Sequence, residues 1–137
     1  MADKFLLEVA TPERLVIREE VTEAQIPAQN GMIGVLPDHA ALLSNLGIGE
    51  LSYVQGPERN SMVVADGWVE IRDNHVRVLA GRAEKADEID VARAQAAMKR
   101  AEERLAQAAG GQVDIGRALN SLKRAQARLA ASRASGH

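Results

Sequence analysis

Short apolar runs separated by turn residues fill the first part of the chain. Residues 5–10 form a β-rich run that ends at Thr11-Pro12, and residues 21–26 alternate with a period of two. Strands of half-buried sheets show this period because successive side chains point to opposite faces. Further runs occupy residues 15–17, 48–55, 62–65, 68–72 and 75–79. Many short strands with turn signals between them indicate a sandwich or a barrel.

Turn and aromatic residues support this interpretation. Asp73-Asn74 separates two of the runs, and both residue types tolerate the left-handed backbone that a tight hairpin turn needs. All three aromatic residues, Phe5, Tyr53 and Trp68, lie in the strand-rich part. We expect them in its core.

The pattern changes after residue 86. From 87 to 134 there is no proline, and 14 of the 48 residues are alanine, which favours helix. The expected boundary residues are Asp87 as the cap of a first helix with Glu88 and Asp90 in its first turn, Gly110-Gly111 as its end, and Asp114 as the cap of a second.

Each expected helix carries a row of apolar residues at alternating steps of three and four. The first row is Val91, Ala94, Met98, Ala101, Leu105 and Ala108, and the second is Ile115, Ala118, Leu122, Ala125 and Leu129. Matching rows joined by a short glycine turn predict an antiparallel helical hairpin. Alanine in place of leucine at a buried position lowers the free energy of docking by about 0.8 kcal/mol for each missing methylene. We therefore interpret this hairpin as stable enough to form and weak enough to open.

The predicted fold class is thus an all-β sandwich domain, residues 1–86, followed by an α-helical hairpin, residues 87–137. Charge divides along similar lines. Residues 1–86 hold 8 Lys/Arg against 13 Asp/Glu, whereas residues 112–137 hold 5 against 1. An acidic body that ends in a basic tail is typical of an interaction arm.

Composition removes several classes of function. There are no cysteines, the net charge is −2, and no apolar run approaches the roughly 20 residues that span a bilayer. The amino terminus carries Asp3 where a targeting peptide would be basic. No Gly-rich loop ends in Lys-Ser or Lys-Thr, and the histidines lack metal-ligand spacing. We therefore expect a soluble, unexported protein that is not an enzyme, holds no metal and binds no nucleic acid.

Residues 31–51, GMIGVLPDHAALLSNLGIGEL, resemble the signature of the epsilon subunit family of bacterial F-type ATP synthases. That family shows Gly-x-x-Gly-aliphatic-aliphatic-Pro-x-His-Ala, then an aliphatic pair and a glycine before the next strand. Three further blocks agree with the family in order and spacing, at residues 65–90, 89–105 and 117–129, and the opening residues 9–16 fit it too.

The resemblance implies a non-catalytic subunit at the foot of the rotating central stalk. The sandwich would contact the γ subunit and the membrane-embedded c-ring, and would couple ring rotation to ATP synthesis in the catalytic head. The helical tail would extend toward the α and β subunits and inhibit ATP hydrolysis. The chain would then lie at the cytoplasmic face of the bacterial plasma membrane, attached only through the complex.

The resemblance also assigns contact residues. Asn30, Gly31 and Met32 would face the c-ring and His39 the γ subunit, although glycines also serve backbone geometry and a histidine on a surface needs no partner. The basic residues assigned to contact with the β subunit are Arg117, Lys123, Arg124 and Arg128. A solvated helix face is the alternative for this basic set.

No cofactor is required, but ATP is implied as a regulatory ligand. Residues 89–94, IDVARA, match the ATP motif of the family, with Asp90 and the backbone near Ala94 reading adenine or ribose. The residues assigned to this site are Glu84, Asp90, Arg93, Ala94, Arg124 and Arg128. Guanidinium groups can hold phosphate oxygens by charge-assisted hydrogen bonds. The alternatives are a helix-start charge for Asp90 and an ion pair within the hairpin for Arg93.

Two other functions are consistent with parts of the sequence. The arginines suit a free-standing ATP-sensing module, and the basic helix suits an adaptor that binds nucleic acid. Neither accounts for the match at residues 31–51.

Overall fold

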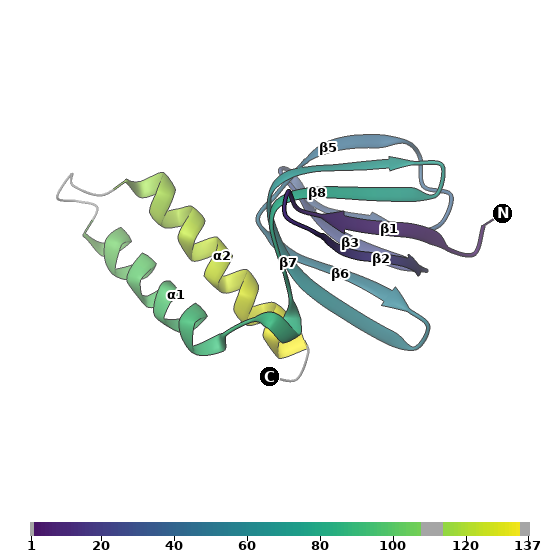
Figure 1. Ribbon diagram of the computed structural model, residues 1–137. Coiled ribbons are helices and arrows are strands. Elements are labelled where there is room, and N and C mark those ends of the chain that lie inside the picture. The colour runs from purple at the N-terminus through teal and green to yellow at the C-terminus, as the bar shows by residue number, and fades with distance from the viewer. Residues whose placement is uncertain (1, 108–113, 135–137) are drawn as a thin grey trace.

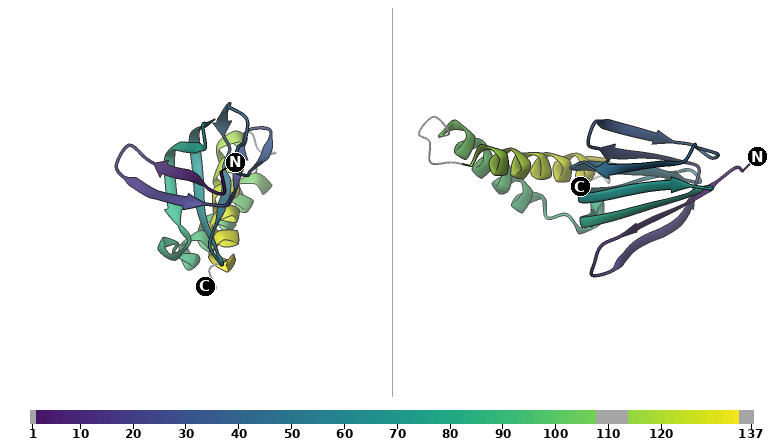
Figure 2. Two further views of the ribbon diagram at one scale, coloured as in Figure 1. Left: turned by 90° about the vertical axis from the view of Figure 1, so that its right-hand side faces the viewer. Right: turned by 90° about the horizontal axis from the view of Figure 1, so that it is seen from above.

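The chain folds into a strand-built body with two helices at one end (Figure 1). A computed structural model describes residues 2–107 and 114–134. Figure 2 shows that the helices extend away from the end of the strand layers instead of covering one of their broad faces. The predicted fold class, an all-β sandwich followed by a helical hairpin, is confirmed.

Six of the eight strands follow predicted runs and are longer at several ends. Residues 31–35 and 42–46 form strands that no run predicted, and the runs at residues 62–65 and 68–72 join in one strand. They are β1 (Phe5–Ala10), β2 (Leu15–Val21), β3 (Glu23–Ala28), β4 (Gly31–Val35), β5 (Leu42–Leu46), β6 (Gly49–Gln55), β7 (Glu58–Arg72) and β8 (His75–Lys85). The helical part comprises the 3-10 turn η1 (Ala86–Glu88), helix α1 (Val91–Ala106) and helix α2 (Ile115–Ala134).

One continuous strand order links the layers of the sandwich. Neighbouring strands run β2-β1-β8-β7-β5-β3-β4, and β6 pairs with both β3 and β7. The β1–β8 pair is parallel and the other pairs are antiparallel. Strand β7 pairs with β6 through its first half and with β5 through its second half, so it belongs to both layers.

The core lies between the layers and consists of aliphatic side chains. Strand β1 alternates buried and half-buried residues along its whole length, as a period of two predicts. Its Leu7 and Val9 have no exposed surface, and neither do Ile26 on β3 and Leu51 on β6. Inward side chains from both layers therefore form one core.

A bend in β7 and β8 directs the two strands from one layer to the other. Asp66 has φ 62°, and the β7–β8 register skips it between the pairs Ala65–Arg82 and Gly67–Ala80. A Cβ on Gly67 would lie 1.8 Å from the carbonyl oxygen of Leu79. Only glycine fits this close approach of two backbones.

The expected hairpin turn is present, but one expected core residue is not buried. Asp73 and Asn74 have φ of 51° and 59°, the left-handed values that a tight turn requires. Phe5 and Tyr53 are buried, whereas Trp68 is 55% exposed. The prediction for Trp68 was wrong because the period of two places alternate residues of this part of β7 outward, and its neighbour Val69 takes the inward position.

The first helix begins three residues later than expected. Asp90, and not Asp87, caps α1, since its Oδ1 accepts a hydrogen bond from the Arg93 amide at 3.0 Å. Asp87 instead lies in η1, which ends β8 before the chain turns into the helix. Asp114 caps α2 as expected, through its Oδ1 and the Arg117 amide at 3.0 Å. The pair Gly110-Gly111 lies outside the described residues.

The apolar rows of the two helices face each other. Helices α1 and α2 are in contact, and the fully buried members of the rows are mostly alanine. These members are Ala94, Ala101, Ala118, Ala125 and Leu129. Ile115 is 50% exposed, contrary to its place in the predicted row, because it begins α2 and no preceding turn lies beneath its side chain. Ala108 lies outside the described residues.

A second face of α2 docks the hairpin on the sandwich. Helix α2 contacts β6, β7 and η1. The buried residues that meet there form a small cluster of Val63, Ala86, Ile89, Ala127 and Ala131. Since three of these five side chains are single methyl groups, the contact buries little apolar area per residue.

The close backbone approach at Gly67 generates a prediction with an internal control. Gly67→Ala should lower the free energy of unfolding by about 1–3 kcal/mol or more, because the added methyl group overlaps the Leu79 carbonyl. Gly116→Ala places its methyl 3.6 Å from Asp114 Oδ1 and should stabilise helix α2 by about 0.5–1 kcal/mol. Urea denaturation followed by circular dichroism measures both. Equal effects of the two substitutions would contradict the bend as described.

Candidate functional site

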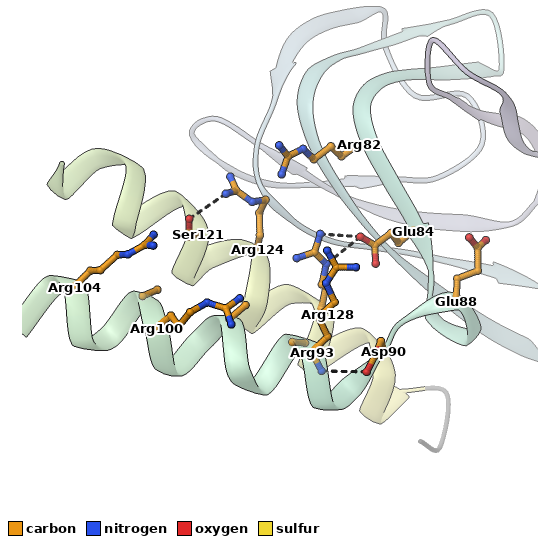
Figure 3. Close-up of a pocket in the computed structure, with 13 residues that line it drawn as sticks. Arg82, Glu84, Glu88, Asp90, Arg93, Arg100, Arg104, Ser121, Arg124 and Arg128 are labelled. Carbon is orange, nitrogen blue, oxygen red and sulfur yellow. Dashed lines mark hydrogen bonds and ion pairs between the residues drawn. The ribbon is translucent and has the colours of Figure 1, made fainter. Parts of the chain in front are cut away.

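A cleft of about 480 Å³ lies where strand β8 meets the two helices. Figure 3 shows side chains from all three elements directed into it. Its lining includes three carboxylates and six arginines, the latter being Arg82, Arg93, Arg100, Arg104, Arg124 and Arg128. The cleft therefore carries a strongly positive wall in a protein whose net charge is −2.

One ion pair crosses the cleft and joins the hairpin to the sandwich. Arg128 of α2 donates to Glu84 Oε1 from Nε at 3.0 Å and from Nη2 at 2.7 Å. The two side chains are 24% and 35% exposed, so water screens the pair only in part. Two donors on a single oxygen leave the second oxygen of Glu84 available to another partner.

The start of α1 supplies the second part of the cleft. The carboxylate of Asp90 accepts the Arg93 amide, as the helix-start alternative anticipated. The Arg93 side chain extends beside Arg128, as Figure 3 shows, and it forms no ion pair with a described residue. Ala94 is 2% exposed and also lines the cleft.

Arg124 is partly buried. Its Nη2 donates to Ser121 Oγ at 3.1 Å, one turn earlier on the same helix. Burial and then the neighbouring Arg82 guanidinium lower the pKa of Arg124 from its ordinary value, although arginine stays protonated at any physiological pH. Asp66 acts in the opposite direction, and Arg128 and Arg117 add to the lowering.

All six residues assigned to ATP from the sequence line this one cleft. The sequence did not indicate five further polar residues of the lining, namely Arg82, Glu88, Arg100, Arg104 and Ser121. Spacing carried the signal for two of them, because Arg100 and Arg104 follow Arg93 by 7 and 11 residues and share its helix face. Arg82 precedes Glu84 by two residues, which places both on one face of β8.

The residues assigned to the β subunit do not form one surface in this conformation. Arg124 and Arg128 point into the cleft, whereas Arg117 is exposed in the first turn of α2. Lys123 faces a different hollow, which it shares with residues of the sandwich such as Gln29 and Gly47.

The residues assigned to the rotor separate into two places. Asn30 and Gly31 form the exposed turn after β3, with φ 126° at Gly31, next to Met32, which is 57% exposed. The adjoining Gln29 lines the hollow that also contains Lys123, so this turn lies at the hairpin end of the sandwich.

His39 lies at the opposite end of the sandwich. Its Nδ1 lies 2.7 Å from the carbonyl oxygen of Ala40. The preceding Asp38 accepts a hydrogen bond from Asn74 Nδ2 at 2.9 Å and holds this loop against the β7–β8 turn, at the end of the sandwich that carries the amino terminus (Figure 1). His39 and the Asn30–Met32 turn therefore belong to two different surfaces.

An exposed apolar group on the outer face of the sandwich was also missed. Leu43, Trp68 and Leu79, on β5, β7 and β8, are 70%, 55% and 48% exposed and line one shallow hollow. Asn45 pairs with Trp68, and Trp68 pairs with Leu79, so these strands are hydrogen-bonded neighbours. The signal was present in the sequence as the outward positions of the alternating pattern. Adjacent exposed apolar side chains mark a surface for contact with another molecule.

The chemistry that this arrangement offers is binding. Arginine forks match phosphate and carboxylate oxygens, and a partly enclosed cleft strengthens such contacts. Within residues 2–107 and 114–134, no three histidine, aspartate or glutamate side chains gather as a metal site would require. None of the described helices has the length and apolar character needed to cross a membrane.

Comparison with known proteins defines the class of this architecture. The family model for the β-sandwich domain of the ATP synthase delta/epsilon chain matches residues 4–86, and the model for its long α-helix domain matches residues 87–133. The class is that of a non-catalytic subunit of the ATP synthase complex. The chain belongs to the ATP synthase delta/epsilon chain family, and the resemblance at residues 31–51 is thereby confirmed.

Individual relatives agree with the family models. A protein of Solibacter usitatus named ATP synthase epsilon chain is 53% identical over 102 residues, covering 74% of this chain and 76% of its own. One of the same name from Koribacter versatilis is 48% identical over 105 residues, covering 77% and 74%. A chain in the Euglena gracilis mitochondrial ATP synthase, OSCP/F1/c-ring, has a TM-score of 0.82 at 21% identity, covering 97% of this chain and 83% of that chain, which supports the fold.

The capping role of Asp90 is separable from any role in binding. Asp90→Ala should destabilise the start of α1 by about 0.5–2 kcal/mol, because the Arg93 amide loses its acceptor. Faster hydrogen exchange at the amides of residues 92–94 would report this loss. Asp87→Ala, three residues earlier in η1, is the control and should leave those amides unchanged.

Proposed function

We propose that this chain is the central-stalk subunit of a bacterial F-type ATP synthase and that its helical hairpin is a nucleotide-regulated brake on ATP hydrolysis. The observation that carries the regulatory part is the arginine-lined cleft between β8, α1 and α2. The unit at residues 1–86 serves the rotor, and the unit at residues 87–137 serves regulation. ATP is the ligand of the cleft.

The charges of the cleft suit a triphosphate. Arg93 and Arg124 have no carboxylate partner among the described residues, so phosphate oxygens would not have to displace one. Arg128 pairs with only one oxygen of Glu84 and retains further donors. Asp90 and the backbone beside Ala94 belong to the start of α1, next to Arg93, and the Asp90 carboxylate suits the amino group or hydroxyls of a nucleoside.

The sandwich offers surfaces for the rotor partners. The exposed apolar group of Leu43, Trp68 and Leu79 suits the γ subunit, because association covers apolar area that water otherwise solvates. The Asn30–Met32 turn suits the polar loops of the c-ring, and His39 suits a second contact with γ. With these partners the chain would be held at the cytoplasmic face of the plasma membrane through the complex.

The brake depends on release of the hairpin. The docking cluster contains mostly alanine, so its apolar contribution is small and the Arg128–Glu84 pair adds only a modest one. On release, Arg124 and Arg128 would leave the cleft and join Arg117 and Lys123 as a basic surface for the β subunit. ATP in the cleft would oppose this step, because a ligand that binds one state stabilises that state.

Titration calorimetry of the full chain with MgATP tests the site. The wild type should bind, and Arg128→Gln should weaken binding by about tenfold or more, because a charge-assisted contact of roughly 1.5–3 kcal/mol is lost. Arg77→Gln is the matched control, since Arg77 lies on β8 but lines the outer hollow. Absence of heat at millimolar nucleotide would remove ATP from the proposal and leave the rotor role standing.

The brake is tested in the assembled complex. A complex that carries the chain truncated after Ala86 should hydrolyse ATP faster than the intact complex, because α1 and α2 are missing. A steady-state hydrolysis assay at equal complex concentration measures this. Co-purification of the truncated chain with γ is the control for assembly. An unchanged rate with normal assembly would exclude the tail as an inhibitor.

A further inference from the structure

The cleft contains more cationic groups than its own carboxylates neutralise. Each of the three lining carboxylates already has a partner: Glu84 pairs with Arg128, Glu88 pairs with Arg14 at 2.8 Å, and Asp90 caps α1. The lining arginines that form no ion pair with a described residue are Arg82, Arg93, Arg100, Arg104 and Arg124. The lining of the cleft therefore carries an excess of positive charge.

Two of these arginines belong to different parts of the fold. Arg82 is on β8 of the sandwich, and Arg124 is on α2 of the hairpin. Figure 3 shows their guanidinium groups at the same end of the cleft, away from Asp90 and Glu88. Arg82 is the charged group with the largest influence on Arg124, and it acts to lower the pKa of Arg124.

The bend in the sandwich fixes this arrangement. Arg82 follows the bend at Gly81 and pairs in register with Ala65, while Glu84 pairs with Val63. Paired residues point to the same face of a sheet, and Val63 belongs to the cluster under α2. The same strand face therefore presents an attractive group to α2 at Glu84 and a repulsive one at Arg82. Asp66 offsets the repulsion only in part, because its attraction for Arg124 is weaker than the effect of Arg82.

We propose that Arg82 and Arg124 form an anion-dependent latch between the sandwich and the hairpin. Without a ligand the two guanidinium groups repel each other and favour release of α2. A terminal phosphate group between them accepts hydrogen bonds from both and turns the repulsion into a bridge. The inference rests on the nucleotide-binding function proposed above, and it assigns the response of the hairpin to one pair of side chains.

The latch makes an unusual prediction about removal of a binding residue. Arg82→Gln should raise the docked fraction of the hairpin in the absence of nucleotide, by about two- to fivefold in its equilibrium constant, as expected for a partly exposed charge pair. The same substitution should reduce the further docking that MgATP produces. Arg82→Glu should dock the hairpin without nucleotide, because it would pair with Arg124. An ordinary ligand contact would change only the second quantity.

The chain contains no cysteine, so two spin labels can be placed at introduced cysteines without other substitutions. Glu20→Cys on β2 and Gln126→Cys on α2 are exposed positions of the sandwich and the hairpin. Pulsed electron paramagnetic resonance on the full chain then gives the docked fraction of the hairpin under three conditions. These are no ligand, MgATP and inorganic triphosphate. Arg77→Gln, on the outer face of β8, is the matched control and should behave as the wild type.

The outcomes separate the latch from the nucleotide site. The latch is supported if ligand-free Arg82→Gln has a higher docked fraction than the ligand-free wild type and if MgATP raises that fraction less than it does in the wild type. Docking of the wild type by inorganic triphosphate as well as by MgATP supports recognition of the phosphate group itself. An unchanged or lower docked fraction in ligand-free Arg82→Gln overturns the latch, even where calorimetry shows that MgATP binds. Absence of binding heat in the wild type removes the nucleotide site and the latch together.

Discussion

The structure depends on the close approach of two backbones at the bend of β7 and β8. Gly67 lies against the Leu79 carbonyl, and Asp66 adopts a left-handed conformation opposite Gly81. This irregularity lets two strands contribute first to one layer of the sandwich and then to the other. It also sets which residues point outward where β7 begins and β8 ends, and α2 docks there on Val63. The exposed apolar group of the outer face and the arginine-lined cleft are thus built on the same pair of strands.

Residues 62–65 of β7 are covered on both faces of the strand. All four are buried, although a strand at the edge of a core usually alternates. Met62 and Val64 face the main core, while Val63 faces the helix. A strand buried on both faces loses the period of two, which is why this segment reads in the sequence as a continuous apolar run. The hairpin therefore completes the burial of the sandwich locally, even though its own contribution is small.

The balance between the two parts of the chain combines weak packing with opposed charges. Methyl groups of Ala127 and Ala131 dock α2, and the Arg128–Glu84 pair crosses the boundary. Uncompensated arginines in the same cleft act against docking. The packing and the ion pair favour docking, the repulsion opposes it, and each contribution to the free energy is small. A bound anion can shift this equilibrium, because its binding free energy needs to exceed only the difference between the opposing contributions.

Sequence patterns predicted six of the eight strands, both helices and the family. Period-two runs, the Asp73-Asn74 turn and the alanine rows are local features, and local features fix strand, turn and helix. The resemblance to the family also indicated six residues of the cleft, through the IDVARA motif, the paired arginines of α2 and the linker position of Glu84. The cap of α1 was misplaced by three residues, since Asp87 and Asp90 are equally suited to cap a helix and only the end of β8 at Lys85, followed by η1, places Asp87 outside it.

Only the tertiary structure decided which side chains meet across elements. Arg82 lies in a strand and Arg124 in a helix 42 residues later, and no periodicity relates them. Their encounter depends on the bend at Gly67 and on the outward direction of Arg82 on β8 after that bend. It also depends on the face of α2 that docks on the sandwich. The same holds for Trp68, whose exposure depends on which face of β7 the opposing layer covers. The local alternation shows that Trp68 and Val69 face opposite sides of β7, and packing between distant segments sets which of the two sides is covered.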